Sequence, residues 1–96
     1  MLKKILKRLD WEIAQAKDYV EQAFIVKPES HTLADLFIEL SKEEMSHAEK
    51  LMREGNNLIA SMKEHDDFIH VWKWMCRKNT ECLNDLNVKI NRFRSY

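Results

Sequence analysis

Two polar residues with metal-binding side chains stand three positions apart in a segment that otherwise repeats apolar residues. Glu44 and His47 occupy positions of a helical heptad repeat whose other members are Leu33, Phe37, Leu40, Leu51 and Leu58. On a helix, residues three apart project from the same face, so one carboxylate oxygen and one imidazole nitrogen can reach a single metal ion. The Glu-x-x-His spacing therefore predicts part of a metal-ligand set.

A third candidate ligand, Glu12, lies in the preceding segment. It is the one charged member of a flank that also contains Ile5, Tyr19 and Val26, so we expect it to point inward. Pro28 lies midway between Glu12 and Glu44 in the sequence, and two helices joined by a short turn there run antiparallel. Because the rise per residue is equal on both helices, Glu12 and Glu44 are expected at the same height.

The same side chains also fit a purely structural role. A Glu and a His between helices can form a buried hydrogen-bonded pair that fixes the register without binding metal, and Glu-x-x-His is a short pattern. The additional carboxylate of Glu12 at a matching height favours the metal site over this alternative.

Three long helices are needed to hold these residues in place. The apolar periodicity predicts helices over about residues 2–26, 31–62 and 66–94. The first ends before Pro28, because a proline disfavours helical geometry at the residue before it, and Ser30 or Thr32 can cap the second. Gly55 is a weak point of the second helix, which we expect to continue past it.

The third helix is expected to supply no further ligand. Its predicted seam consists of Ile69, Trp72, Cys76, Asn79, Leu83, Leu86, Ile90 and Phe93. Glu81 and Asp85 fall off this seam toward solvent. The seam position of Trp72 predicts a core residue, whereas the pattern leaves the role of Trp74 open.

A second copy of the chain would complete the ligand count. A di-iron carboxylate bundle takes a Glu from each of two helices and a Glu-x-x-His from each of two others, and this chain has one of each. A twofold homodimer brings four Glu and two His around a pair of ions, with the third helices outside. The pattern thus predicts an all-α, four-helix di-iron bundle completed by homodimerisation, with two Fe ions per dimer and Mn as the alternative metal.

Composition narrows the class of protein. Ninety-six residues with one Gly, one Pro and 33% charged side chains indicate one all-α domain over residues 1–96. Sixteen basic residues balance sixteen acidic ones, which argues against nucleic-acid or membrane partners. No segment has the pattern of a membrane span or a signal peptide, and Cys76 and Cys82 match no zinc or disulfide pattern. We expect a soluble, cytoplasmic protein with reduced thiols.

The segment from Glu44 to Leu51, Glu-Met-Ser-His-Ala-Glu-Lys-Leu, resembles the second helix of bacterioferritins and rubrerythrins in the ferritin-like superfamily. Members of that superfamily typically carry a Glu followed seven residues later by a Tyr, and Glu12 and Tyr19 hold that relation. The resemblance covers about residues 5–54. It implies metal ligation by Glu12, Glu44 and His47, with Tyr19 close enough to hydrogen-bond a ligand or donate an electron.

Full-length relatives carry a second hairpin with another Glu and another Glu-x-x-His, and this chain does not. It therefore looks similar to the shortened encapsulated ferritins, in which two chains build the site between them. Their cargo-targeting tail is not recognisable in the last six residues, Asn91 to Tyr96.

The residues and the resemblance together imply a ferroxidase that oxidises Fe(II) to Fe(III) with oxygen or peroxide at a site shared by two chains, in a homodimer or a larger oligomer. The same ligands would also serve a di-metal peroxidase or an iron-delivery protein. An alternative of another class is a non-enzymatic helical interaction module, in which Glu44 and His47 only fix register. In that module the third helix would present Trp72 and Trp74 to a partner.

Overall fold

The computed structural model describes residues 1–61 and 67–95, which form three α-helices and no strand. The helices are α1 (Leu2–Val26), α2 (His31–Ser61) and α3 (Phe68–Ser95). The predicted all-α class is confirmed. Where residues are described, the observed helix bounds lie within one residue of the predicted ones; the predicted end of the second helix and start of the third lie outside the described residues.

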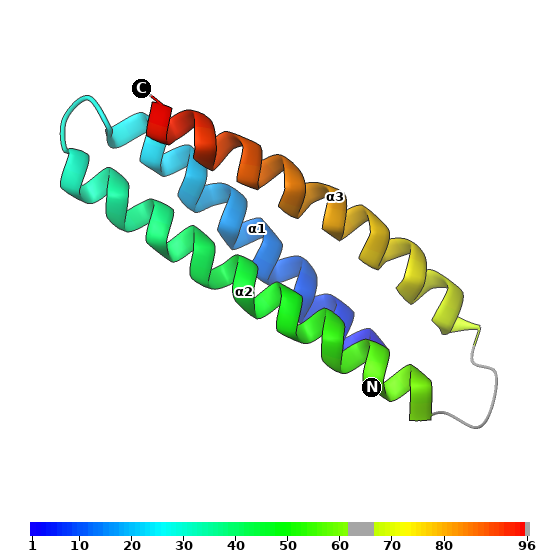
Figure 1. Cartoon of the computed structure of the whole chain (residues 1–96). Coiled ribbons are helices and arrows are strands. Elements are labelled where there is room, and N and C mark those ends of the chain that lie inside the picture. Colours follow the sequence, from blue (N-terminus) through cyan, green and yellow to red (C-terminus); the bar gives the residue numbers. More distant parts are fainter. Residues whose placement is uncertain (62–66, 96) are drawn as a thin grey trace.

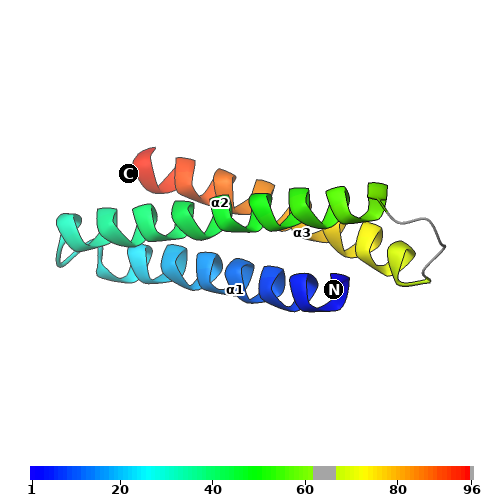
Figure 2. The same cartoon turned by 90° about the horizontal axis from the view of Figure 1, so that it is seen from below.

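The helices form an elongated three-helix bundle, 54 Å long and 15 to 17 Å across. α1 and α2 make an antiparallel hairpin, and α3 returns along it in the direction of α1, so that the end of α3 lies near the turn between α1 and α2 (Figure 1). The view from below also shows the end of α3 at the same end of the bundle as the turn between α1 and α2 (Figure 2). α3 packs mainly against α1 and touches α2 much less, which leaves one long side of the hairpin without a covering helix.

The turn between α1 and α2 is closed by local hydrogen bonds. The backbone N–H of Ser30 donates to the Val26 carbonyl at 2.8 Å, and the Leu33 N–H donates to the Ser30 Oγ at 3.1 Å. Ser30 is thus the N-cap of α2, one of the two residues predicted for that role. This short turn makes the two helices antiparallel neighbours, as predicted. The predicted effect of Pro28 on Lys27 was wrong: Lys27 has helical dihedral angles, φ −52° and ψ −43°, and its N–H donates to the Ala23 carbonyl, because a following proline disfavours the helical region without excluding it.

The side of α2 that packs against α1 differs from the predicted seam by one residue. The most buried residues of α2 are Ala34, Ile38, Ser41, Met45, Ala48 and Gly55. Four of them are small and stand seven positions apart in the sequence: Ala34, Ser41, Ala48 and Gly55. Small residues let two helix backbones approach closely, whereas the larger apolar residues of the predicted seam lie beside this line, half-buried or exposed. The prediction was wrong because a repeat of small side chains gives only a weak hydrophobic signal.

α2 continues through Gly55 as predicted, and a packing contact explains why this residue is a glycine. It is buried inside the helix, and a Cβ added there would overlap the indole ring of Trp72. Trp72 is fully buried, and its Nε1 donates to the Asn56 Oδ1 at 2.9 Å. Trp72 is thus a core residue, as predicted, and it is not available to a partner protein. Trp74 remains 50% exposed.

The remaining seam of α3 packs as predicted. Its buried residues are Trp72, Asn79, Leu83, Leu86, Ile90 and Phe93. Near the end of α3, the Phe93 ring meets the Phe24 ring of α1 edge-on, with centroids 5.5 Å apart. Within residues 1–61 and 67–95, no helix combines the length and the apolar character that crossing a lipid bilayer requires.

Candidate metal centre

Three side chains from two helices meet halfway along the hairpin. Glu12 comes from α1, and Glu44 and His47 come from α2. One potential ligand atom from each residue lies within 4.8 Å of those of the other two. The His47 Nδ1 is 3.5 Å from the Glu12 Oε2 and 4.0 Å from the Glu44 Oε2. The structure therefore brings together the three residues that the sequence predicted as ligands.

A buried hydrogen bond next to the cluster sets its geometry. Ser41 is fully buried, and its Oγ donates to the Ala16 carbonyl at 2.8 Å. Ser41 precedes Glu44 by three residues, and Ala16 follows Glu12 by four, so this bond lies about one helical turn from both carboxylates. It fixes the relative height of α1 and α2 at the point where the cluster needs it.

The cluster opens on the side of the hairpin that lies away from α3. Asp10 faces α3, since its carboxylate accepts a hydrogen bond from the Asn79 amide at 3.4 Å. Glu12 comes two residues later, which is about 200° further around the helix axis. The Glu12 residue is only 2% exposed, whereas the His47 side chain is 52% exposed. The carboxylates thus form the floor of the cluster and the imidazole forms its rim.

Two carboxylate oxygens in the cluster lack the partners that buried polar atoms need. The Glu12 Oε2 and the Glu44 Oε2 are buried, and neither has a hydrogen-bond partner in the part of the chain that the structure describes. The other Glu12 oxygen, Oε1, accepts a hydrogen bond from the Arg8 Nε at 3.0 Å. A buried acceptor without a donor costs free energy, and two such oxygens side by side form a site that a cation would satisfy.

The donor set determines which cations would fit. Two carboxylates and one imidazole are intermediate in softness and suit Fe(II), Mn(II) or Zn(II). Three side chains are too few to saturate two such ions. Among residues 1–61 and 67–95, this is the only group of three or more acidic, His or Cys side chains close enough to share an ion. As predicted, Glu81 and Asp85 of α3 are exposed. The described residues of one chain therefore provide three ligand side chains, too few for a pair of ions.

Tyr19, predicted to lie near the metal site, packs within the hairpin. Its ring stacks on that of Phe37, with centroids 6.1 Å apart and an interplanar angle of 28°. The structure does not include it in the group of three, and its role stays a prediction.

Comparison with known proteins gives the chain no family: no family model, curated protein or solved structure matches it. Its function therefore has to be inferred from the side chains and their geometry.

Sequence reasoning missed two residues that shape the cluster, Arg8 and Ser41. Arg8 precedes Glu12 by four residues, a spacing at which side chains on a helix are neighbours, so the pair was detectable. Ser41 is a small polar residue followed by three charged ones, and its buried hydrogen bond depends on the backbone of α1, which no local pattern reveals.

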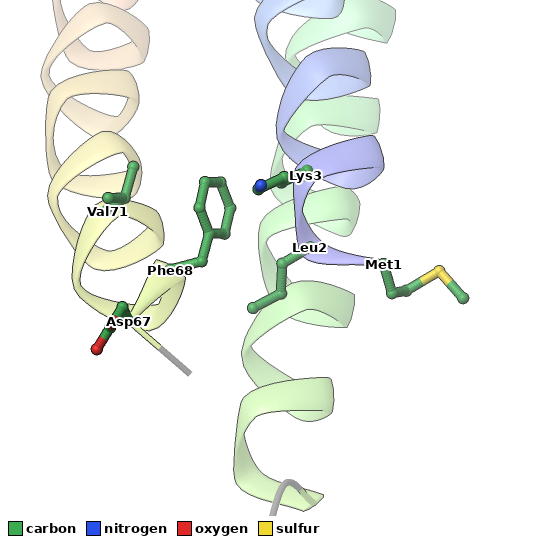
Figure 3. Close-up of a pocket in the computed structure, with 6 residues that line it drawn as sticks. All are labelled: Met1, Leu2, Lys3, Asp67, Phe68 and Val71. Atoms are coloured by element: carbon green, nitrogen blue, oxygen red, sulfur yellow. The ribbon is translucent and has the colours of Figure 1, made fainter. Parts of the chain in front are cut away.

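A separate pocket of about 470 Å³ lies at the far end of the bundle. It lies between the start of the chain and the start of α3, and its lining residues are Met1, Leu2, Lys3, Asp67, Phe68 and Val71 (Figure 3). The Lys3 Nζ lies 5.6 Å from the centre of the Phe68 ring there. Glu12 is about three helical turns, or ~15 Å, further along α1. The pocket is mostly apolar and has no part in the chemistry of the cluster.

Proposed function

We propose that two copies of this chain form a dimeric di-iron protein of the ferritin-like type that oxidises Fe(II) to Fe(III) with oxygen or peroxide. One observation carries the proposal. The Glu12 Oε2 and the Glu44 Oε2 are buried together without hydrogen-bond partners, next to the Nδ1 of His47. A buried acceptor without a donor costs free energy, and a cation bound between the two oxygens would satisfy both.

The ligand count supports the dimer. A di-iron carboxylate bundle uses four Glu and two His from four helices, and α1 and α2 of two copies supply that number. In a twofold dimer each copy contributes the same surface, so one half-site meets its own duplicate. The same six side chains would then hold the iron while oxygen or peroxide oxidises it.

The surface around the cluster supports a second copy as the partner. Leu33 precedes Glu44 by eleven residues and Leu36 precedes His47 by the same number, which is about three helical turns. The two leucines therefore lie on the same side of α2 as the ligands. They are 40% and 47% exposed, and Trp11, next to Glu12, is 48% exposed. Exposed apolar side chains on the same side of α2 as the ligands, three turns away, fit an interface that buries both together.

The chemistry expected of the residues follows from their charges. Four carboxylates from two copies carry a charge of 4−, which balances two Fe(II) ions and favours the ferric state as the positive charge grows. His47 would supply an uncharged nitrogen ligand at the accessible rim. Bound iron would supply the electrons, while the protein positions ions and oxidant and keeps the carboxylates out of water.

The metal site is tested by titrating the full chain anaerobically with Fe(II) or Mn(II) and measuring bound metal and molecular mass before and after chelation. We expect one ion per chain and a dimer that the metal stabilises. Glu12→Gln should lose most of the binding, whereas Glu43→Gln, which removes the exposed carboxylate next to Glu44, should keep it. A monomer that binds no transition metal under reducing, iron-supplemented conditions would refute the proposal.

A double variant separates the metal site from a structural Glu and His pair. With Glu44→Ala and His47→Ala together, the metal proposal predicts that bound metal disappears. Unchanged metal content, or a double variant that only stabilises a metal-free dimer, would show that these residues fix register.

The oxidation step is tested separately by following the formation of Fe(III) under oxygen and under peroxide. Wild-type protein should accelerate oxidation by at least one of the two, and Glu12→Gln should not. The faster oxidant distinguishes an oxygen-dependent ferroxidase from a peroxidase. If the site binds iron but accelerates neither reaction, the proposed enzymatic activity is refuted and iron delivery remains as the function.

A further inference from the structure

Arg8 holds one of the two oxygens of Glu12. Its Nε donates to the Glu12 Oε1 at 3.0 Å, while the Glu12 Oε2 points into the cluster without a hydrogen-bond partner. The Arg8 side chain is 60% exposed, and its guanidinium carbon lies 4.5 Å from the centre of the Trp11 ring. The guanidinium is therefore placed by contacts with Trp11 and Glu12, two adjacent residues of α1.

This ion pair is poorly suited to a role in helix stability alone. Within helices, a pair with the acid four residues before the base is the more stabilising order, and here the base comes first. The pair also differs from an ordinary surface pair, because its carboxylate is buried and its second oxygen belongs to the candidate metal site. The geometry thus links Arg8 to the cluster.

The hydrogen bond restricts what Glu12 can offer a metal ion. The Arg8 hydrogen bond uses one acceptor position of Oε1, whereas Oε2 has no hydrogen-bond partner, so the geometry favours metal binding through Oε2 alone. A second effect comes from charge, since a guanidinium next to the carboxylate repels a cation bound on its other side. Both effects reduce the affinity of the site for a divalent metal.

We propose that Arg8 is a positioning residue that limits Glu12 to one metal-binding oxygen and keeps the affinity of the centre for divalent metal low. This inference rests on the proposed function. A moderate affinity suits iron that is a substrate and has to leave after oxidation, whereas a carboxylate free to use both oxygens would retain it.

The variant that tests this is Arg8→Gln, with Lys7→Gln as the matched control. Lys7 is the preceding residue, is exposed, and loses the same charge. Calorimetric titration of the full chain with Mn(II) should show binding that is tighter in Arg8→Gln, on the order of tenfold. Removing the positive charge removes its repulsion of the ion, and solvent screening of the exposed guanidinium limits the gain. The difference should shrink at high salt, where charge effects are screened. Lys7→Gln should match wild type within about threefold, since surface charges have small effects.

Two further measurements separate this role from a structural one. The Co(II) form of Arg8→Gln should show weaker visible absorption than wild type, because an additional oxygen ligand raises the coordination number. Arg8→Lys keeps the charge and should restore the affinity to within about threefold of wild type, since lysine can also pair with an acid four residues on. If Arg8 only stabilised the helix, Arg8→Gln would change the melting temperature and leave the Co(II) spectrum unchanged.

The outcomes distinguish the two proposals. If wild-type protein binds neither Mn(II) nor Co(II), the proposed function fails. If wild type binds them and Arg8→Gln binds equally or more weakly, with an unchanged Co(II) spectrum, the metal site stands and the role of Arg8 is refuted.

Discussion

Replacing Glu44 by Gln should stabilise the metal-free protein and at the same time abolish its metal binding. The Glu44 Oε2 is buried without a hydrogen-bond partner, and so is the Glu12 Oε2. One carboxylate oxygen of each residue lies within 4.8 Å of one of the other. Two negative charges at that separation repel by about 1 to 3 kcal/mol for effective dielectric constants between those of water and a protein surface. Glutamine removes this repulsion, and its amide N–H can donate to Glu12.

The expected gain is smaller than the sum of these effects. Arg8 already offsets part of the negative charge, and Glu44 is partly exposed to solvent. We therefore expect a net stabilisation of about 1 to 2 kcal/mol, which for a domain of this size corresponds to a rise in melting temperature of roughly 5 to 10 °C. Thermal unfolding of chelator-treated protein at fixed concentration, followed by circular dichroism, measures it.

Adding metal should reverse the order of stability. At a free Mn(II) concentration of about 100 times the Kd, binding stabilises the wild type by roughly 2.7 kcal/mol, whereas Glu44→Gln should gain little. Glu43→Gln, with the same charge change at an exposed neighbour, should melt within about 3 °C of wild type without metal and should still respond to Mn(II). If metal-free Glu44→Gln melts at or below the wild-type temperature, the two oxygens are not an uncompensated pair and the main argument for the metal site fails.

Three further predictions concern other parts of the bundle. Gly55→Ala should lower stability by about 1 to 2 kcal/mol in denaturant unfolding although alanine is the better helix former, because its Cβ would overlap the Trp72 ring; a stabilised variant would contradict this packing. Burial raises the pKa of the Cys76 thiol, so its alkylation at neutral pH should be slower than that of a free thiol and should accelerate at higher pH than a free thiol requires; equal rates would contradict this. Trp74→Ala should change the melting temperature by no more than about 3 °C, since its side chain is half exposed, and a larger loss would show that Trp74 is covered in solution.

The shift of the buried line on α2 has a consequence for the proposed function. Had Glu44 and His47 lain at the centre of the contact with α1, both would be enclosed within one chain. Instead, the small residues Ala34, Ser41 and Ala48 occupy the contact, and the ligands lie beside it at the open face of the hairpin. That position is what allows a second copy to reach them.

The helices and the identity of the three clustered residues could be predicted from the sequence. The start of α2 follows from local chemistry, since Ser30 caps it as predicted. The end of α1 was placed correctly but for the wrong reason, because Lys27 keeps helical geometry before Pro28. The meeting of Glu12 with Glu44 follows from one short turn midway between them, because antiparallel helices with equal rise bring equidistant residues to the same height. Both kinds of inference need only local geometry.

Tertiary structure alone decided which line of α2 faces α1, how open the cluster is, and which carboxylate oxygens are left without partners. Close backbone contact at Ala48 and Ser41 depends on how two surfaces fit together, and the hydrophobic pattern weights large side chains over small ones. The hydrogen bond from Ser41 to the Ala16 carbonyl and the orientation of Glu12 toward Arg8 depend on atoms from neighbouring turns and helices. Such contacts are set by packing in three dimensions, so residue types and spacing indicated the candidate ligands, whereas the fold determined which of their atoms remain available to a metal.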